Sequence, residues 1–350
     1  MASRISIQQS GDGLTSISAL HEDIIRTHIL TRLDGPTLAS TGCASSSLQE
    51  LSGDDKLWQQ ICNQTWPSTT NPIVQQFIST MPSGHRSFYC DCFPTLNHHS
   101  RSTRVNQSPS KPVQELELSK KHLYPQTSGV ISAVDICYRN RPILSKVHES
   151  ETETGWFLFS PFSVDLLGPK ETVSSPAKFH DRGEETLQSE LQENLTLSWI
   201  LVDPITKRAA NFSSLRPVSV TVHWLTSDVQ AQYATVLGLF LCTVLVTCGG
   251  KEGGDVDVLQ LKEVSLHVED MDGRILSGKD SLVIFKEAME SGKKVGKRGD
   301  ERERYEEFLR RKRERRERKE RRERQLDLVC IATGVTIFVA WVVLLLRRYC

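Results

Sequence analysis

The cysteines and histidines around position 90 are the residues of this sequence whose types could bind a metal. Cys90-Asp91-Cys92 lies between His85 and the pair His98-His99, so several soft ligands occur within 15 residues. Zinc sites use standard ligand spacings, and this stretch matches none of them. The alternative is that the cysteines are free thiols in a surface loop. We therefore predict no metal and no cofactor.

Catalytic motifs are equally absent from the sequence, which holds no Walker loop, GxGxxG, GxSxG or HExxH. Trp199, His223 and Trp224 lie in β-like stretches, so we interpret them as core or sheet-face residues. A ligand groove lined by Trp224 is the alternative. Three other charged residues are interpreted as loop charges: Asp203, Arg208 and Arg216. The sequence thus predicts a protein without catalytic residues of its own.

The overall composition is that of an ordinary globular protein. The 350 residues are 38% hydrophobic and 25% charged, with a formal net charge of zero. These values exclude a wholly disordered chain, a collagen and a polytopic membrane protein. Residues 286–350 carry 20 Lys or Arg against 12 Asp or Glu, a net of +8, which leaves −8 for residues 1–285. A basic end on an acidic body suggests an interaction tail.

Residues 20–66 predict a small helical unit that must position any binding surface. Ile25, Ile29 and Leu33 recur at every fourth position, which places them on one stripe of a helix. Asp34-Gly35-Pro36 ends that helix and begins the next, because proline is favoured in a first turn. Asp54 is a candidate N-cap of a later helix. So small a unit is marginal alone, and we expect its surplus apolar face to meet a partner.

This stretch resembles the F-box, whose pattern is Leu-Pro-x-Asp/Glu and two aliphatic residues, then Ile-Leu-x-x-Leu, a further Leu, Val-Ser or Val-Cys, and a late Leu-Trp. The matching positions are Leu20, Asp23, Ile24, Ile25, Ile29, Leu30, Leu33, Leu38, Ala44, Ser45, Leu57 and Trp58. His21 replaces the usual proline, and one extra residue lies between Asp23 and Ile29. Ala44 is smaller than the usual valine.

The segments HILTRLDGPTLAS and LWQQICNQTWPS are similar to a plant F-box family that carries a downstream β-rich region. Some members of that family also end in a basic run and a hydrophobic tail. The resemblance implies a non-catalytic subunit that binds a Skp-type adaptor and, through it, a cullin-RING ligase of the SCF class. It implies these adaptor-binding residues: Leu20, Asp23, Ile24, Ile25, Ile29, Leu30, Leu33, Pro36, Leu38, Ala44, Leu57 and Trp58. The alternative is a helical cap on the β-rich region.

Residues 128–292 predict an antiparallel, sandwich-like β-domain, which makes the fold class α+β. The expected strands are Val130–Tyr138, Trp156–Ser160, Leu195–Val202, Val218–Leu225, Tyr233–Thr247, Val256–Val268 and Ser281–Phe285. About seven strands in roughly 160 residues are typical of a sandwich. A slip in the alternation at Lys262–Glu263 predicts a bulge. The polar residues 170–190 predict a long surface loop.

Two apolar stretches could each form either a buried core element or a membrane span. Residues 233–248 are short and contain threonines, so we predict two buried strands, with a membrane span as the alternative. Residues 328–346 carry no charge over 19 positions, and as a helix they measure roughly 28 Å, close to bilayer thickness. They show no polar stripe, which disfavours a buried core helix. Only four residues follow them, so we predict a tail anchor with the body in the cytosol.

The segment before this span is strongly charged. Residues 301–324 hold 13 Lys or Arg and 8 Glu, with five Glu–Lys/Arg pairs at i,i+4 in the favourable order. We predict a solvated helix that continues into the span as one rod, with lipid headgroups near its end. The basic flank supports a cytosolic body. The interleaved glutamates weaken the alternative of nucleic-acid binding, and we predict none.

The N-terminus has no apolar signal segment, so the nine cysteines are expected to be thiols in the reducing cytosol. In that topology the four glycosylation sequons, at Asn63, Asn106, Asn194 and Asn211, stay unused. The predicted order begins with a disordered N-terminus (1–16), the F-box (17–68), and a helical extension and linker (69–127). A β-rich substrate-binding domain (128–292), a charged helix (293–325), the transmembrane helix (326–346) and a tail (347–350) follow.

Two functional hypotheses follow. The first is a membrane-anchored substrate-recognition subunit of an SCF ubiquitin ligase, at the endoplasmic reticulum or another membrane that takes tail anchors, with an unknown protein substrate. The second is a tail-anchored scaffold or lectin-like protein without a role in ubiquitination. Binding of the adaptor separates them.

Overall fold

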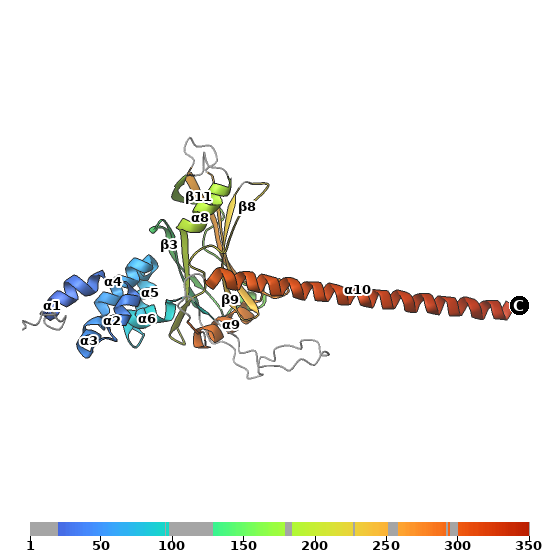
Figure 1. Ribbon diagram of the computed structural model, residues 1–350, viewed down its shortest axis with the longest axis horizontal. Helices are drawn as coiled ribbons and strands as arrows, with labels where there is room; N and C mark the ends of the chain where they lie inside the picture. Colours follow the sequence, from blue (N-terminus) through green and yellow to red (C-terminus); the bar gives the residue numbers. More distant parts are fainter. Residues whose placement is uncertain are drawn as a thin grey trace, which may run out of the picture.

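A computed structural model shows three parts in sequence order: a helical unit, a β-rich body and a long C-terminal helix (Figure 1). The structure describes residues 20–94, 96–97, 129–178, 184–226, 228–250, 258–291, 293–294 and 300–349. The expected disordered N-terminus at 1–16 and the polar linker at 98–112 lie outside the described residues. The helical unit and the far end of the C-terminal helix lie at opposite extremes of the molecule (Figure 1).

The predicted helices of residues 20–66 are present, and three more helical elements follow. Their bounds are α1 (Glu22–Ile24), η2 (Ile25–Ile29), η3 (Leu30–Arg32), α2 (Gly35–Thr41), α3 (Ser46–Ser52), α4 (Asp55–Thr65), η4 (Pro67–Thr70), α5 (Pro72–Ser79) and α6 (Gly84–Cys92). Short polar side chains begin most of them. Asp34, Ser45 and Asp54 each accept a backbone N–H of the following helix, which confirms the predicted cap at Asp54.

The smaller main sheet is antiparallel, with strand order β3-β2-β6-β7. Its strands are β2 (Val130–Tyr138), β3 (Arg141–Ser150), β6 (Leu195–Asp203) and β7 (Arg208–Asn211). The bounds predicted for β2 are confirmed, and β6 runs one residue further than expected. Arg139 and Asn140 adopt positive φ angles in the tight turn between β2 and β3.

The larger sheet is also antiparallel and has the order β4-β11-β10-β9-β8, with β5 on β11. Its strands are β4 (Ser163–Asp165), β5 (Val173–Lys178), β8 (Ser219–Val222), β9 (Val229–Leu237), β10 (Phe240–Gly249) and β11 (Val258–Asp270). The apolar residues 233–248 form β9 and β10 around a turn at Gly238, as predicted, and not a membrane span. Thr247 pairs with Glu263 but Cys248 with Leu261, which confirms the predicted bulge. A short pair, β1 (Leu96–Asn97) and β12 (Lys293–Lys294), stands apart.

The two larger sheets share one hydrophobic core. Trp199 from the smaller sheet and Tyr233 from the larger one are both fully buried in it. Two helices close this core: α8 (Glu184–Asn194) contributes Leu191, and α9 (Gly278–Ser291) contributes Phe285, whose ring lies 4.7 Å from that of Phe212. The prediction of antiparallel β-structure in an α+β protein is thus confirmed.

Two predicted strands are wrong, because they are helices. Of the strand predicted at 156–160, residues 156–159 fall in α7 (Gly155–Phe159), where the Thr154 hydroxyl accepts the N–H of Phe157 at 3.2 Å. Residues 281–285 fall in α9, where Ser277 Oγ accepts the N–H of Asp280 at 3.2 Å. In both segments the cap outweighs the β-propensity of the apolar residues that follow it.

The predicted loop at residues 170–190 is also wrong. It contains β5 and most of α8. Leu187 and Leu191 are spaced at i,i+4 and are 5% and 0% exposed, so α8 covers the core with a narrow apolar stripe. Two leucines among polar residues are a weak periodic signal, which explains the error.

The helical unit packs on the outer face of the smaller sheet. Ile131, Ala133, Ile200 and Val202 point away from the shared core and join the apolar cluster of the helices. The indole N–H of Trp66 donates to Ser198 Oγ at 3.1 Å across this junction. The helical unit is therefore a third layer of the body (Figure 1).

Helix α10 (Asp300–Tyr349) docks on the larger sheet by its first turns. Tyr305 and Phe308 are 8% and 3% exposed, in a cluster with Val218, Ala234 and Leu241. This part of the helix is therefore not purely solvated, contrary to the prediction. Among the described residues, the last cross-links to the body are ion pairs of Lys312 with Glu269 at 2.9 Å and of Arg315 with Asp272 at 3.2 Å.

The remainder of α10 extends away from the body as one continuous helix (Figure 1). It is long and apolar enough to cross a membrane, and none of its most apolar 18-residue window is buried. Leu328 and Trp341, for example, are 69% and 61% exposed. This exposure rules out the alternative of a buried core helix.

Candidate functional site

The first turn of the helical unit shows how the sequence accommodates its departures from the F-box pattern. His21 Nδ1 accepts the N–H of Asp23 at 3.3 Å, so the imidazole caps the helix. The chain then forms a π-helical segment at Ile25–Ile29. A π-turn holds one residue more than an α-turn, which matches the extra residue between Asp23 and Ile29.

This π-turn changes which residues face inward. The N–H of Leu30 bonds to the carbonyl of Ile25, and these two side chains are 1% and 4% exposed. Ile29 and Leu33 are only half-buried. Leu20 and Ile24 are 44% and 45% exposed, although both are large apolar residues. Ile25, Ile29 and Leu33 all contact the apolar cluster of the helical unit, as the stripe predicts, but Leu30 and not Ile29 is fully buried beside Ile25.

Helix α2 is held close to the rest of the unit. The Asp34 carboxylate accepts the N–H of Thr37 at 3.0 Å, and Leu38 is fully buried. Gly35 lies against the ring of Tyr89, so closely that a Cβ at this position would be 2.2 Å from Tyr89 Cζ. Only glycine fits here, and Pro36 beside it remains exposed on the surface.

The late Leu-Trp pair of the pattern belongs to the interior. Leu57 and Trp58 are 6% and 1% exposed on α4. The indole N–H of Trp58 donates to the carbonyl of Ser52 at 2.7 Å, and its ring lies 5.3 Å from that of Tyr89. Burial raises the pKa of the Tyr89 phenol, which stays neutral at physiological pH.

The structure thus divides the twelve implied adaptor-binding residues into three groups. The outer group is exposed and consists of Leu20, Asp23, Ile24, Pro36 and Ala44. The half-exposed group consists of Ile29 and Leu33. The inner group is buried and consists of Ile25, Leu30, Leu38, Leu57 and Trp58. The outer group lies on or beside helices at the extreme end of the molecule, away from both sheets (Figure 1).

The cysteine-rich segment offers no metal centre in the part of the chain that the structure describes. No group of three or more His, Cys, Asp or Glu residues there could hold a metal ion. Cys90 and Cys92 lie on α6 and not in a loop, and Cys92 is 1% exposed. His98 and His99 lie outside the described residues. Burial raises the pKa of the neighbouring Cys62 thiol to about 12, so this thiol is unreactive at neutral pH.

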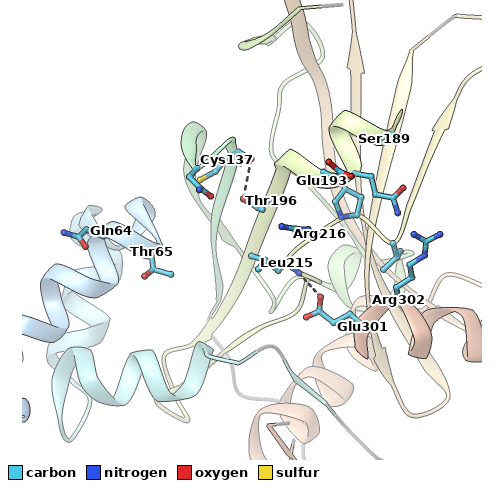
Figure 2. A pocket seen from close by; sticks show the side chains of 14 residues that line it. Gln64, Thr65, Cys137, Ser189, Glu193, Thr196, Leu215, Arg216, Glu301 and Arg302 are labelled. Atoms are coloured by element: carbon cyan, nitrogen blue, oxygen red, sulfur yellow. Dashed lines mark hydrogen bonds between the residues drawn. The ribbon is translucent and has the colours of Figure 1, made fainter. Parts of the chain in front are cut away.

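A cavity of about 1100 Å³ lies on the side of the body, between α4, α8 and the start of α10 (Figure 2). Arg216, interpreted from the sequence as a loop charge, lines this cavity together with Glu193 and Glu301. Sequence reasoning missed the site because its walls come from five separate parts of the chain. A cavity assembled in this way leaves no local motif.

The other residues singled out in the β-domain divide differently from the prediction. Trp199 is a core residue, as expected. Trp224 is 87% exposed beyond the end of β8, so its interpretation as a core or sheet-face residue is wrong. Asp203 is 4% exposed and accepts the N–H of Ile205 at 2.9 Å, while Arg208 begins β7 and pairs with Asp91 at 3.4 Å. Neither is a simple loop charge.

Comparisons with known proteins agree with the helical pattern. The chain is 44% identical to F-box protein At2g27310 of Arabidopsis thaliana, an alignment that covers 95% of this chain and 97% of the relative. It is 42% identical to Probable F-box protein At2g36090 of the same plant, over 99% of each chain, and 41% identical to F-box protein At3g44326, over 87% and 83%. No family model and no solved structure matches the chain.

Relatives at this identity align with nearly the whole chain and not with the helical unit alone. The β-rich body and the C-terminal region are therefore part of the shared architecture. The chain belongs to the plant F-box protein family.

Proposed function

We propose that this chain is the substrate-recognition subunit of an SCF-type ubiquitin ligase, tethered to a membrane by α10. The helical unit binds a Skp-type adaptor and, through it, a cullin-RING ligase. The sandwich-like β-domain binds a protein substrate, and ubiquitin transfer itself is carried out by the ligase. The observation that carries the proposal is the exposed apolar pair Leu20 and Ile24, within a chain whose relatives are F-box proteins.

Exposed leucine and isoleucine side chains at the end of a helical layer are costly unless a partner covers them. Leu20 and Ile24 are 44% and 45% exposed, so burying the rest of each side chain in an interface contributes about 1 kcal/mol. The buried residues Ile25, Leu30 and Leu38 lie directly behind this surface and keep its helices in place. The inner group of the F-box pattern therefore supports the surface, and the outer group supplies the contacts.

The rigid junction with the smaller sheet suits a recognition subunit. A ligase must present its substrate at a fixed place relative to the adaptor. The hydrogen bond between Trp66 and Ser198 and the shared apolar cluster at Ile131 and Ile200 prevent the β-domain from swinging on a linker. Substrate bound to the β-domain then keeps one orientation toward the cullin arm.

The decisive experiment is capture of a purified Skp-type adaptor by the full-length chain in nanodiscs. Wild type should bind, and Ile24→Asp should lose at least ten-fold in affinity, because it places a charge in a desolvated contact. Ile205→Asp is the matched control, since Ile205 is 53% exposed on the β6–β7 connection and lies outside the F-box pattern. Absence of adaptor capture by wild type would sink the proposal and favour the scaffold hypothesis.

Membrane attachment is a separate element of the proposal. The exposed apolar window of α10, preceded by residues 316–324 with six Lys or Arg and three Glu, supports a span whose near side faces anionic lipid. The body, which lies on the basic side, would then be cytosolic. Alkaline carbonate extraction of the full-length chain tests this element independently of adaptor binding.

A further inference from the structure

The hairpin formed by β8 and β9 carries an aromatic residue at its tip that nothing in the described body covers. Trp224 and Leu225 are 87% and 69% exposed. The ring of His223 stacks beside Trp224, with centroids 6.4 Å apart and planes inclined by 24°. Large apolar side chains at a hairpin tip add nothing to the core, so their exposure calls for a binding partner.

The described residues of the tip are tied to one another and to the sheet. The N–H of His223 donates to the carbonyl of Asp228 at 2.7 Å, which closes the loop. His223 Nδ1 also accepts the N–H of Thr226 at 3.3 Å. Lys262 on β11 clamps the base of the loop through an ion pair with Asp228 at 2.8 Å. A preorganised tryptophan loses little entropy on binding, which is the property of an interface anchor.

Charged side chains line the cavity at the other end of β8. Arg302 is paired with Glu306 at 3.1 Å, and Glu301 accepts the N–H of Leu215 at 3.1 Å (Figure 2). Arg216 and Glu193 are exposed cavity residues that form no ion pair with any residue the structure describes. The cavity therefore presents one cation and one anion that a ligand can satisfy.

The tip and the cavity lie at the two ends of β8, and together they are called the β8 surface. Arg216 precedes β8 and Trp224 follows it, while α8, which carries Glu193, packs against β8 (Figure 1). Eight residues separate Arg216 from Trp224, at most about 26 Å of extended chain. A bound peptide of seven or eight extended residues spans the same distance.

We propose that this surface binds the protein substrate as an extended segment. An acidic and a basic side chain of the segment pair with Arg216 and Glu193 in the cavity, and an aromatic or large aliphatic side chain packs on Trp224. This inference rests on the proposed function, since it assigns the recognition site of the same ligase subunit. The hairpin tip lies well away from the C-terminal half of α10 (Figure 1), which favours a protein over the membrane as its partner.

The test is selection from a displayed library of random 12-residue peptides on the full-length chain in nanodiscs. Empty nanodiscs remove lipid binders. The expected enriched peptides carry neighbouring acidic and basic residues, with an aromatic or large aliphatic residue six to eight positions away. One such peptide is then synthesised, and its affinity is measured for each variant.

Trp224→Ala should lower the affinity for that peptide by about ten-fold or more, as expected for the loss of an interface anchor. Trp156→Ala is the matched control, because Trp156 is 84% exposed on α7, outside the proposed surface, and should bind the peptide normally. Arg216→Glu should abolish the preference for an acidic residue, and a repeated selection on it should enrich a basic residue instead. Arg274→Glu, at an exposed site elsewhere, should leave the preference unchanged.

Three results would overturn the proposal: no enrichment over empty nanodiscs, a selected peptide that Trp224→Ala and Arg216→Glu bind normally, or quenching of Trp224 fluorescence by brominated lipids. The last, measured as the difference from Trp224→Phe, would assign the tip to the bilayer. Adaptor capture by the same preparations separates the two levels of inference. If wild type binds the adaptor but selects no peptide, only the proposed peptide site is refuted. If wild type does not bind the adaptor, the proposed function is refuted.

Discussion

Ser68 on η4 donates both its backbone N–H and its hydroxyl to the carboxylate of Asp135 on β2, at 2.8 and 2.5 Å. Ser145 on β3 donates to the same carboxylate at 2.6 Å. Asp135 is only 2% exposed, so this is a buried polar link. It joins the end of the helical unit to two strands of the smaller sheet, and it fixes the orientation of the helical unit relative to that sheet.

Removal of this carboxylate should destabilise the junction. We expect Asp135→Ala to lower the free energy of unfolding by about 1–3 kcal/mol, because the buried N–H of Ser68 loses its acceptor. Asp135→Asn should cost less, since an amide oxygen still accepts from Ser68 and the amide NH₂ can donate to the hydroxyl. Chemical denaturation of the full-length chain in nanodiscs measures both variants. Equal losses would contradict the role of the hydrogen bonds.

The same residue predicts a pH dependence. Burial raises the pKa of Asp135 from its ordinary value of 3.8, although the hydrogen bonds from Ser145 and Ser68 oppose the change. The folded chain therefore binds this proton more tightly than the unfolded chain. This tighter binding stabilises the folded chain fully at pH values below the pKa of Asp135 in the unfolded chain. The stabilisation is lost as the pH rises through the pKa of Asp135 in the folded chain. Wild type should thus lose stability relative to Asp135→Asn over this window, and a pH-independent difference would refute the assignment.

Substitutions of two adjacent isoleucines should distinguish residues that stabilise the helical unit from residues that contact the adaptor. Ile25→Ala should lower stability by about 2–4 kcal/mol, because Ile25 is 4% exposed in the core. Ile24→Ala should leave stability unchanged but weaken adaptor binding, because Ile24 is 45% exposed. Denaturation midpoints and adaptor affinity are measured on the same samples. A stable Ile25→Ala variant would show that the π-turn does not direct Ile25 inward.

The docked turns of α10 should open when their anchor is removed. Phe308 is 3% exposed against the larger sheet, so Phe308→Ala should release the start of the helix. Hydrogen exchange should then increase at Val218 and Ala234, which pack under it. Leu326→Ala is the control, since Leu326 is 58% exposed beyond the docked region. Unchanged exchange in Phe308→Ala would show that the ion pairs of Lys312 and Arg315 suffice.

The apolar end of α10 predicts where the chain resides. Deletion of residues 326–350 should release the protein into the soluble fraction with its body folded, because the exposed span lends no side chain to either core. Val335→Arg with Val339→Arg should mimic the deletion, at a cost of roughly 2.5–3.5 kcal/mol per mid-span arginine. Carbonate extraction followed by circular dichroism is the measurement. A truncated chain that stays on membranes would locate the anchor elsewhere.

How much of this fold the sequence predicts depends on how local the signal is. The bounds of β2 follow from a run of strand-favouring residues, and the bulge at Lys262 follows from side-chain alternation; neighbouring residues alone define both signals. The helices at 155–159 and 278–291 were mistaken for strands, because their short apolar runs satisfy either period. The caps at Thr154 and Ser277 were the available signal.

The candidate sites show the same limit. The F-box pattern locates the helical unit but does not separate Ile24 from Ile25, because one π-turn decides which of them faces the core. The cavity at Arg216 could not be predicted, since α4, α8 and α10 meet there only after the two sheets have packed. Long-range assembly, and not local propensity, creates that surface.

The part of α10 beyond its docked turns has a mechanical consequence. From Arg315, the last residue that the structure pairs with a described residue of the body, to Leu328 the helix rises about 20 Å. Its charged side chains pair along its own length, as Arg318 with Glu314 and Arg321 with Glu317, so this segment behaves as a strut. In the membrane-anchored ligase subunit proposed above, this rigid segment would hold the body at a fixed height above the bilayer. The length of the helix would then decide which substrate lysines the transferred ubiquitin can reach.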